Sequence, residues 1–192
     1  MRVLYSVGVK AFVVHPDQAG VWKARSGYRI LVIENGGLRF HFPNDWCAGL
    51  DSKFVRIVDR EPPNDRCSLM VSCRHISTPM ACFPIRELLR EITTDGAAER
   101  PILDRGPVIS VFRPPLEAAW RQMRFVDALQ RQDACTRVCL ARGGRTLATL
   151  VFDFWAKDEL CFHDMWTTLL ETLAVGEYIA DPTTGRRREL RG

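Results

Sequence analysis

The sequence predicts an α+β fold, in which an antiparallel β-sheet is covered by amphipathic helices as an α/β/α sandwich. Runs of alternating apolar residues are joined by short turn sequences, which is typical of strands that pair as hairpins. Two other segments carry apolar residues at helical spacing, and each helix needs a sheet face to bury its apolar stripe. With 192 residues, of which 46% are hydrophobic, the chain is large enough for one domain with a real core.

The first hairpin is predicted between strands at residues 28–33 (YRILVI) and 38–42 (LRFHF). They flank the sequence ENGG, whose asparagine and glycines tolerate the positive φ angles of a tight turn. Alternation places Phe40 and Phe42 on one face, and a proline ends the strand shortly before Trp46. We expect both phenylalanines to fill the core and Trp46 to close one end of the sandwich.

The remaining strands follow in two groups, one before and one after a first helix. We expect them at residues 53–59, 68–75, 107–113, 118–128, 134–142 and 145–154. Gly143-Gly144 marks a two-residue hairpin turn between the last two strands. The segment 99–107 (ERPILDRGP), rich in proline and glycine, is expected to be an irregular crossover.

Two helices are predicted from apolar residues at helical spacing. The first begins at Pro84, ends at Asp95-Gly96, and has an apolar stripe made of Ile85, Leu88, Leu89 and Ile92. The second begins at Asp158 and Glu159, whose charges suit the positive end of a helix dipole, and ends at Gly176. Its stripe consists of Phe162, Met165, Trp166, Leu169, Leu170 and Leu173.

Three regions are expected along the chain. Residues 1–26 form an N-terminal extension or an extra strand, residues 27–178 form a single sandwich domain, and residues 179–192 form a basic flexible tail. The tail contains Arg186, Arg187, Arg188 and Arg191, and it carries +2 of the net charge of +4. A nearly neutral body argues against a nucleic-acid domain. The alternative is weak nucleic-acid binding through these four arginines, which would fall steeply with salt.

The seven cysteines include no CxxC pair and are best explained as small buried thiols in a reducing compartment, so we expect a cytoplasmic protein. A run of eighteen apolar residues is also missing from the sequence, so we expect no membrane-spanning helix.

Four residues could ligate a metal ion: the sequence pairs Cys73 with His75 and Cys161 with His163 at the same spacing. Alternate residues on a strand point the same way, whereas 161 and 163 on a helix do not, so a zinc site would need both pairs to converge. We expect no metal, no cofactor and no catalytic residue. A small metal-dependent enzyme built on these four residues is kept as an alternative hypothesis.

Three arginines on predicted strands, Arg121, Arg124 and Arg137, could form a basic stripe on the sheet. Cross-strand pairing with Asp127 and Asp133 is the alternative.

The segments GLRFHFPNDW, KFVRIVD, SLMVSCRH and LATLVFDFWAKDELCFHDMWTTLLETL together resemble the PsbP/DcrB-like sandwich superfamily, over roughly residues 28–175. Members begin with an aromatic-x-aromatic-Pro-x-x-Trp strand, matched here by Phe40, Phe42, Pro43 and Trp46. The resemblance implies an antiparallel sheet covered by helices. Its members include photosystem accessory proteins, a Ran-binding nucleotide-release factor and chaperones of secreted effectors. The superfamily offers no shared catalytic residues, and this chain lacks the lipobox of the membrane-anchored members.

Together these observations predict a non-enzymatic accessory, adaptor or chaperone-like protein that binds another protein. Such a protein would accept its partner at an apolar patch on the sheet or on its edge strands. The sequence does not identify that partner.

Overall fold

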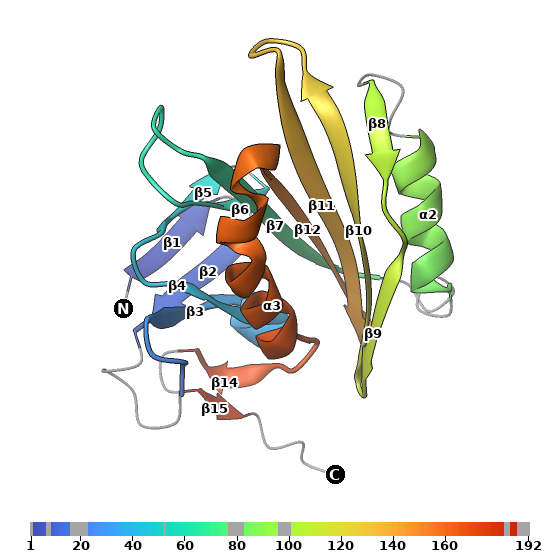
Figure 1. Ribbon diagram of the computed structural model, residues 1–192. Helices are drawn as coiled ribbons and strands as arrows, with labels where there is room; N and C mark the ends of the chain where they lie inside the picture. The colour runs from blue at the N-terminus through green and yellow to red at the C-terminus, as the bar shows by residue number, and fades with distance from the viewer. Residues whose placement is uncertain are drawn as a thin grey trace.

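Two large antiparallel β-sheets, a small two-stranded sheet and two α-helices are described by the structure, a computed structural model that covers residues 2–6, 9–15, 23–51, 53–76, 83–95, 101–182 and 185–187. Figure 1 shows the smaller sheet beside the larger one, with helix α3 between them and helix α2 next to β8 and β10. None of the helices in these ranges is long and apolar enough to cross a membrane.

The smaller sheet has five strands in the order β1-β2-β3-β4-β13, and every neighbouring pair is antiparallel. Its strands are β1 (Arg2–Ser6), β2 (Val9–Val14), β3 (Tyr28–Ile33), β4 (Leu38–Pro43) and β13 (Ala174–Val175). The β3–β4 hairpin has the expected boundaries, with Ile33 opposite Leu38. Its turn, which includes the short 3-10 helix η2 (Glu34–Gly36), takes positive φ at Glu34, Asn35 and Gly36, whereas Gly37 has a negative φ.

The larger sheet follows the order β5-β6-β7-β12-β11-β10, and β8 and β9 both pair with the outer side of β10. Its strands are β5 (Cys47–Asp51), β6 (Phe54–Val58), β7 (Cys67–His75), β8 (Ile102–Arg105), β9 (Ile109–Arg113), β10 (Leu116–Asp127), β11 (Gln132–Gly143) and β12 (Thr146–Trp155). A long antiparallel sheet built from successive hairpins agrees with the prediction.

Three details of the predicted sheet are corrected. The strands occupy two sheets, because the 28–43 hairpin pairs with β2 and β13 and not with the later strands. β5 was not predicted, and the expected crossover at 99–107 contains strand β8, which gains its hydrogen-bond partner from β10. Pairing of this kind is decided by a distant strand, so a short polar segment such as ILDR gives little local signal for it.

The first helix, α2 (Ile85–Asp95), matches its predicted boundaries. Ile85 and Leu89 are buried and Leu88 packs against them, but Ile92 is 41% exposed and Thr93 is buried in its place. Thr93 accepts a hydrogen bond from Arg121 Nη1 at 3.2 Å, and this contact requires the helix to turn the threonine toward the sheet.

The second helix is divided in two. Residues Ala156–Phe162 form a 3-10 helix (η4), and α3 (His163–Thr172) follows directly. Asp158 and Glu159 lie in the first turn of η4, where their side chains pair with Arg66 and Arg137 of the sheet. The predicted apolar stripe is confirmed: five of its residues are buried, and Leu170 is partly buried.

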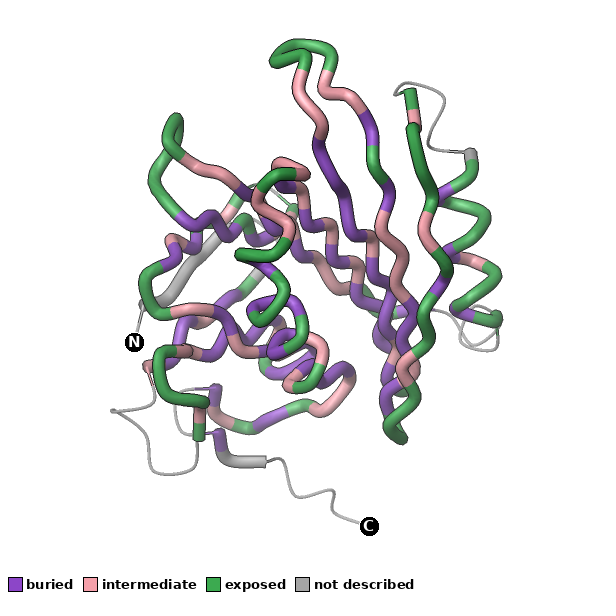
Figure 2. Tube along the Cα trace, viewed as in Figure 1, coloured by how far each residue is buried: buried purple, intermediate pink, exposed green. Residues whose placement is uncertain are grey.

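The main core lies between the two sheets and is filled by α3. Figure 2 shows buried positions alternating with intermediate ones along strands that face it, such as β4, β7 and β12. Trp46 and Trp166 are 6% and 3% exposed, which confirms that both indoles lie inside. Trp46 stacks on Phe152 with ring centroids 6.3 Å apart, and Phe152 lies parallel to Trp166 at 5.8 Å. A separate, smaller core lies under α2 on the opposite face of the larger sheet.

Two glycines let the sheets approach each other closely. A Cβ atom on Gly143 would lie 1.9 Å from the Val175 carbonyl oxygen, and one on Gly176 would lie 2.2 Å from the Gly143 oxygen. Gly176 was expected to end the second helix, and Gly143-Gly144 to form the last hairpin turn. Instead α3 ends at Thr172, and the turn consists of Gly144 and Arg145, because Gly143 pairs with Thr146.

Beyond β13, β14 (Ile179–Asp181) and β15 (Arg186–Arg187) form a small antiparallel pair within the region predicted to be a tail. Ile179 is buried against Ile30 and Val32 of the smaller sheet, so this part of the chain is held to the domain.

Candidate functional site

The outer edge of the larger sheet exposes large apolar side chains. β8 and β9 both use one side to pair with β10, and neither has a strand partner on the other side within the described part of the chain. Phe112, Leu103 and Ile109 on these strands are 74%, 56% and 41% exposed. We call these three residues the edge patch; Ile109 and Phe112, three positions apart on β9, point to opposite faces of the sheet, so the patch lies along both sides of the edge. An apolar edge with unpaired backbone groups is a template for a further strand.

A chain of contacts leads from the edge patch to another exposed aromatic residue, Phe83. Phe112 is opposite Glu117 on β10, which is in turn opposite Arg142 on β11. Arg142 pairs with Glu117 and donates a hydrogen bond of 2.8 Å to the Phe83 carbonyl oxygen. Phe83 is itself exposed, and its backbone is connected to this ion pair through Arg142.

Behind this edge, a hollow of about 280 Å³ lies between α3 and the larger sheet; we call it the α3 pocket. The helix contributes His163, Trp166, Thr167, Leu170 and Glu171. The sheet contributes Val111 and Arg113 from β9, Trp120 from β10 and Arg137 from β11. Two indoles and two aliphatic side chains make most of the lining apolar.

Arg137 is the buried charge of the α3 pocket, with 3% of its surface exposed. Its guanidinium carbon lies 4.9, 5.7 and 5.9 Å from the ring centroids of Phe154, Trp166 and Trp120. Burial lowers the pKa of Arg137, while Glu159 and Cys135 act in the opposite direction. The basic stripe suggested by the sequence does not form, because Arg137 is buried in this aromatic cage and Arg124 pairs with Asp133.

Arg113 fixes the C-terminal end of α3 to the edge strand. Its guanidinium donates to the carbonyl oxygens of Leu170, Glu171 and Leu173, at 2.6 Å for Leu170 and 3.1 Å for Leu173. A cation at the carboxyl end of a helix satisfies carbonyl groups that have no partner within the helix. The width of the α3 pocket is therefore set by a contact between β9 and α3.

A second hollow, of about 750 Å³, lies where the two sheets meet; we call it the junction pocket. Its polar lining includes Glu34, Asn35, Arg74, Thr146 and Tyr178. Glu34 and Asn35 have φ angles of 49° and 51°, which are uncommon for residues other than glycine. The backbone amide of Lys10 donates to the Glu34 carboxylate at 2.9 Å, and the Tyr178 and Thr146 hydroxyls are 3.0 Å apart.

Cys73 and His75, proposed from the sequence as metal ligands, both line the junction pocket. Burial and the nearby Glu34 carboxylate raise the pKa of the Cys73 thiol to about 12. This thiol therefore stays protonated near neutral pH. Among the described residues, no group of three or more His, Cys, Asp or Glu side chains is placed to hold a metal ion.

The other sequence candidates lie apart from the junction pocket. Cys161 is exposed on η4, and His163 lines the α3 pocket, so the structure does not bring the two Cys/His pairs together. Arg186 and Arg187 form β15, and the positions of their side chains lie outside the described structure, as do Arg188 and Arg191.

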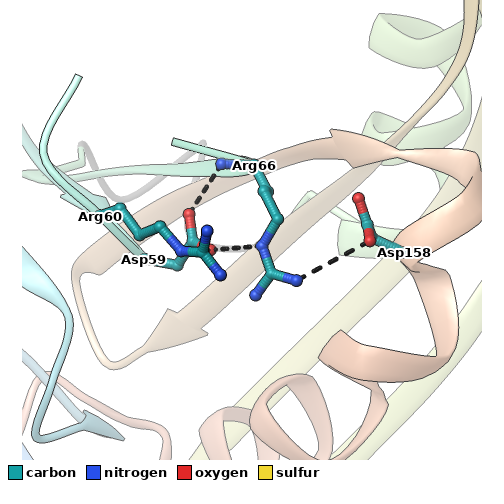
Figure 3. A network of polar contacts seen from close by, with 4 residues as sticks. All are labelled: Asp59, Arg60, Arg66 and Asp158. Carbon is teal, nitrogen blue, oxygen red and sulfur yellow. Dashed lines mark hydrogen bonds and ion pairs between the residues drawn. The ribbon is translucent and has the colours of Figure 1, made fainter. Parts of the chain in front are cut away.

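A polar network fixes the start of η4 to the larger sheet (Figure 3). Asp59 is buried and accepts two hydrogen bonds from Arg66, at 2.8 Å from the backbone amide and 2.9 Å from Nε. Arg60 Nε lies 3.7 Å from the same carboxylate, and Arg66 Nη1 lies 3.9 Å from Asp158 of η4. The burial of Asp59 tends to raise the pKa of its carboxyl, but the hydrogen bonds and charge of Arg66 lower it overall. We assign this network a structural role, because both carboxylates are engaged with arginines.

Known proteins resemble this chain in both sequence and fold. The model of a family described as Alr1449 matches residues 29–179, a range that includes both helices, the whole larger sheet and strands β3, β4 and β13 of the smaller sheet. The chain belongs to the Alr1449 family. The uncharacterized protein alr1449 of the cyanobacterium Nostoc sp. is 31% identical to it over 166 residues, which cover 85% of each chain. The matched residues of this chain include the edge patch, the α3 pocket and most of the junction pocket.

Solved structures show that this member of the Alr1449 family has a PsbP-like fold. Cyanobacterial PsbP (CyanoP) from Synechocystis has a TM-score of 0.53 at 10% identity, over 84% of this chain and 99% of CyanoP. LpqN of Mycobacterium tuberculosis, described as involved in cell envelope biogenesis, has a TM-score of 0.54 at 11% identity, over 89% and 97% of the two chains. A protein from Bacteroides thetaiotaomicron scores 0.54 at 10% identity, over 82% of this chain and 53% of its own. The expected PsbP-like superfamily is thereby confirmed at the level of fold.

The sequence did not indicate the α3 pocket. Arg137 lies in the predicted strand ACTRVCLAR, where it is the one charged residue at the alternate positions that otherwise hold Cys135, Cys139 and Ala141. A charge within an apolar alternation is the signal that would have singled it out.

Proposed function

We propose that the protein is a non-enzymatic accessory protein that binds another protein by accepting an extended apolar segment at the β8–β9 edge. The observation that carries the proposal is the edge patch, whose Phe112 is three-quarters exposed on a strand that has one paired side. Backbone groups on the outer side of β9 would pair with the incoming segment, and the exposed side chains would supply apolar contact.

Two features favour a short segment as the occupant. Proline residues lie close to both ends of β9, at Pro107 and Pro114, so strand pairing on the outer side is limited to about the five residues of β9. Arg105 is exposed at the end of β8 that leads into β9. It favours a partner segment that carries an acidic residue, because opposite charges help to fix its register.

We also propose that the protein works in the cytoplasm and that its partner is a protein. Cys47, Cys67, Cys73, Cys135, Cys139 and Cys161 are all free thiols, which supports a reducing compartment. The PsbP-like fold supports an accessory role through the resemblance described above.

The test is site-specific photocrosslinking in the cell that naturally makes the protein. A benzophenone amino acid is placed at Phe112, and in parallel at Leu129 and Leu160, which are 93% and 89% exposed but lie away from the edge, on the β10–β11 turn and on η4. We expect one discrete crosslinked protein from position 112 and none from the two control positions.

A second step tests whether the crosslink depends on the apolar side chains of the edge. Ile109→Asp in the Phe112 crosslinking variant should abolish the product, because it places a charge within the edge patch, whereas Ile109→Leu should retain it. Equal crosslinking from all three positions, or a product that survives Ile109→Asp, would refute docking at this edge.

A further inference from the structure

We propose that the α3 pocket is a binding site for a small apolar carboxylate, with Arg137 as the group that binds the anion. This site lies on the α3 face of β9, and a small ligand there does not require a protein partner at the outer edge, so the proposal does not depend on such docking. The observations that support it are the hydrogen-bonding state of Arg137, the shape and lining of the pocket, and the charges around it.

The Arg137 guanidinium has more donors than its contacts use. A guanidinium carries five N–H donors, and Nε donates one hydrogen bond of 2.7 Å to Gln122. Its neighbouring carboxylate is 3.7 Å from Nη2, which is an ion-pair distance and too long for a hydrogen bond. That carboxylate, Glu159, is 44% exposed and accepts a hydrogen bond of 2.8 Å from Gln122 Nε2 instead. A buried cation is stabilised when its remaining donors find acceptors, and a ligand carboxylate offers two in the geometry of the guanidinium.

The lining suits an apolar body attached to that carboxylate. Trp120 and Trp166 meet edge to face with centroids 5.6 Å apart, and Val111 and Leu170 add aliphatic surface. The indole Nε1 of Trp166 is buried with no hydrogen-bond partner in the described structure. At about 280 Å³, the α3 pocket is at the small end of ligand sites, which corresponds to a molecule with on the order of ten non-hydrogen atoms.

The charges that line the pocket also favour an anion. Glu171 is the one acidic side chain among the lining residues, against Arg113 and Arg137. Arg113 is engaged with the carbonyl oxygens at the end of α3, so Arg137 is left as the cation for the ligand. A phosphate or sulfate ion would match the guanidinium but would leave the apolar walls without contact, so we assign the site to an organic carboxylate.

The test compares two ligands of the same shape, 3-phenylpropanoate and its neutral amide, 3-phenylpropanamide. Each is titrated into the full-length protein, and the tryptophan indole N–H signals are followed by NMR, with Trp120→Phe and Trp166→Phe used for assignment. We expect the carboxylate to shift the Trp120 and Trp166 signals saturably, with a Kd of about 4 mM or tighter from ordinary ligand efficiency. The amide should bind at least about tenfold more weakly, because it lacks the charge-assisted contact with Arg137.

Variants then locate the anion contact. Arg137→Gln should reduce carboxylate affinity to that of the amide, and Arg137→Lys should restore part of it. Arg74→Gln, in the junction pocket, is the matched control and should leave affinity unchanged. If Arg137→Gln does not fold, the comparison of the two ligands on the natural chain still decides the question.

Three results would overturn the proposal. They are equal affinity for carboxylate and amide, no shift of either indole signal up to 20 times the expected Kd, and a loss of binding in Arg74→Gln that Arg137→Gln does not share. None of these results bears on crosslinking from Phe112, so the two proposals fail separately.

Discussion

The two faces of the larger sheet are covered by helices with similar apolar spacing, yet they are packed very differently. On one face, α3 places Met165, Trp166 and Leu169 in a core that also includes the smaller sheet. On the other face, α2 contributes Ile85 and Leu89 to a small cluster and leaves Ile92 exposed. The difference shows that helical spacing reveals which side of a helix is apolar, but not how many other elements will cover it.

Polar contacts between the sheet and the helices also differ between the two faces. Arg113, Arg66 and Arg137 each connect the sheet to η4 or α3 through carbonyl groups or carboxylates. Beside α2, the corresponding contacts are those from Arg121 to Thr93 and from Arg142 to the Phe83 carbonyl. We therefore expect the α3 face to account for most of the sensitivity of the fold to substitution.

The largest effect is expected for Trp166→Ala on the α3 face. Trp166 is 3% exposed and contacts Phe152 and Trp120, so its removal leaves a large cavity. We expect a loss of about 4 kcal/mol in the free energy of unfolding, measured by urea denaturation. Trp166→Phe should lose clearly less. A loss below about 1 kcal/mol for the alanine variant would contradict the central position assigned to α3.

Gly143→Ala tests the junction between the sheets. The new Cβ would overlap the Val175 carbonyl oxygen, and since this is backbone it can move away only by separating β11 from β13. We expect a loss of about 3 kcal/mol in unfolding free energy. Gly144→Ala is the matched control: its φ is +56°, but nothing lies within 4 Å of its added Cβ, so about 1 kcal/mol is expected. Equal effects at both positions would mean that the junction tolerates a wider spacing.

Leu89→Ala measures the smaller core under α2. Leu89 is fully buried, but the cluster around it is small and can close partly over the cavity, so we expect a loss of about 2.5 kcal/mol by urea denaturation. Ile92→Ala on the same helix should change stability by less than about 0.5 kcal/mol, because Ile92 is on the exposed side. If Leu89→Ala costs more than Trp166→Ala, the ranking of the two faces is reversed.

Asp59→Asn gives the smallest of the four effects and adds a pH dependence. We expect a loss of about 2 kcal/mol at pH 7, because hydrogen bonds from Arg66 to a charged acceptor are replaced by weaker ones. Since the pKa of Asp59 is lower in the folded protein, its contribution is present above its ordinary value of 3.8 and is lost as pH falls through the folded pKa.

Thermal melts of the natural chain and of Asp59→Asn between pH 2 and pH 7 test this sign. The difference in melting temperature should shrink as the pH falls below about 4. A constant or growing difference would show that the charge of Asp59 is not what stabilises the β6–β7 connection.

The elements that the sequence predicted well share a local cause. The β3–β4 hairpin and the buried stripe of α3 depend on alternation, turn residues and helical spacing within about ten residues. Where the expectation was wrong, a distant partner decided the outcome: β8 is a strand because β10 pairs with it, and Gly176 lies against Gly143 on another sheet. Cys73 and His75 are two residues apart on one strand, so the sequence placed them side by side. The α3 pocket combines residues from α3, β9, β10 and β11, which are distant in the sequence, so it was missed.

The sequence by itself determined the antiparallel class, most strand and helix boundaries, and the burial of Trp46 and Trp166, because all of these follow from short-range patterns of apolar residues. Only the tertiary structure decided that most strands divide between two sheets, that Arg137 is enclosed by three aromatic rings, and that β9 has no outer strand partner among the described residues. The physical reason is that strand pairing and the burial of a charge depend on residues far away in the chain, and these carry no local signature.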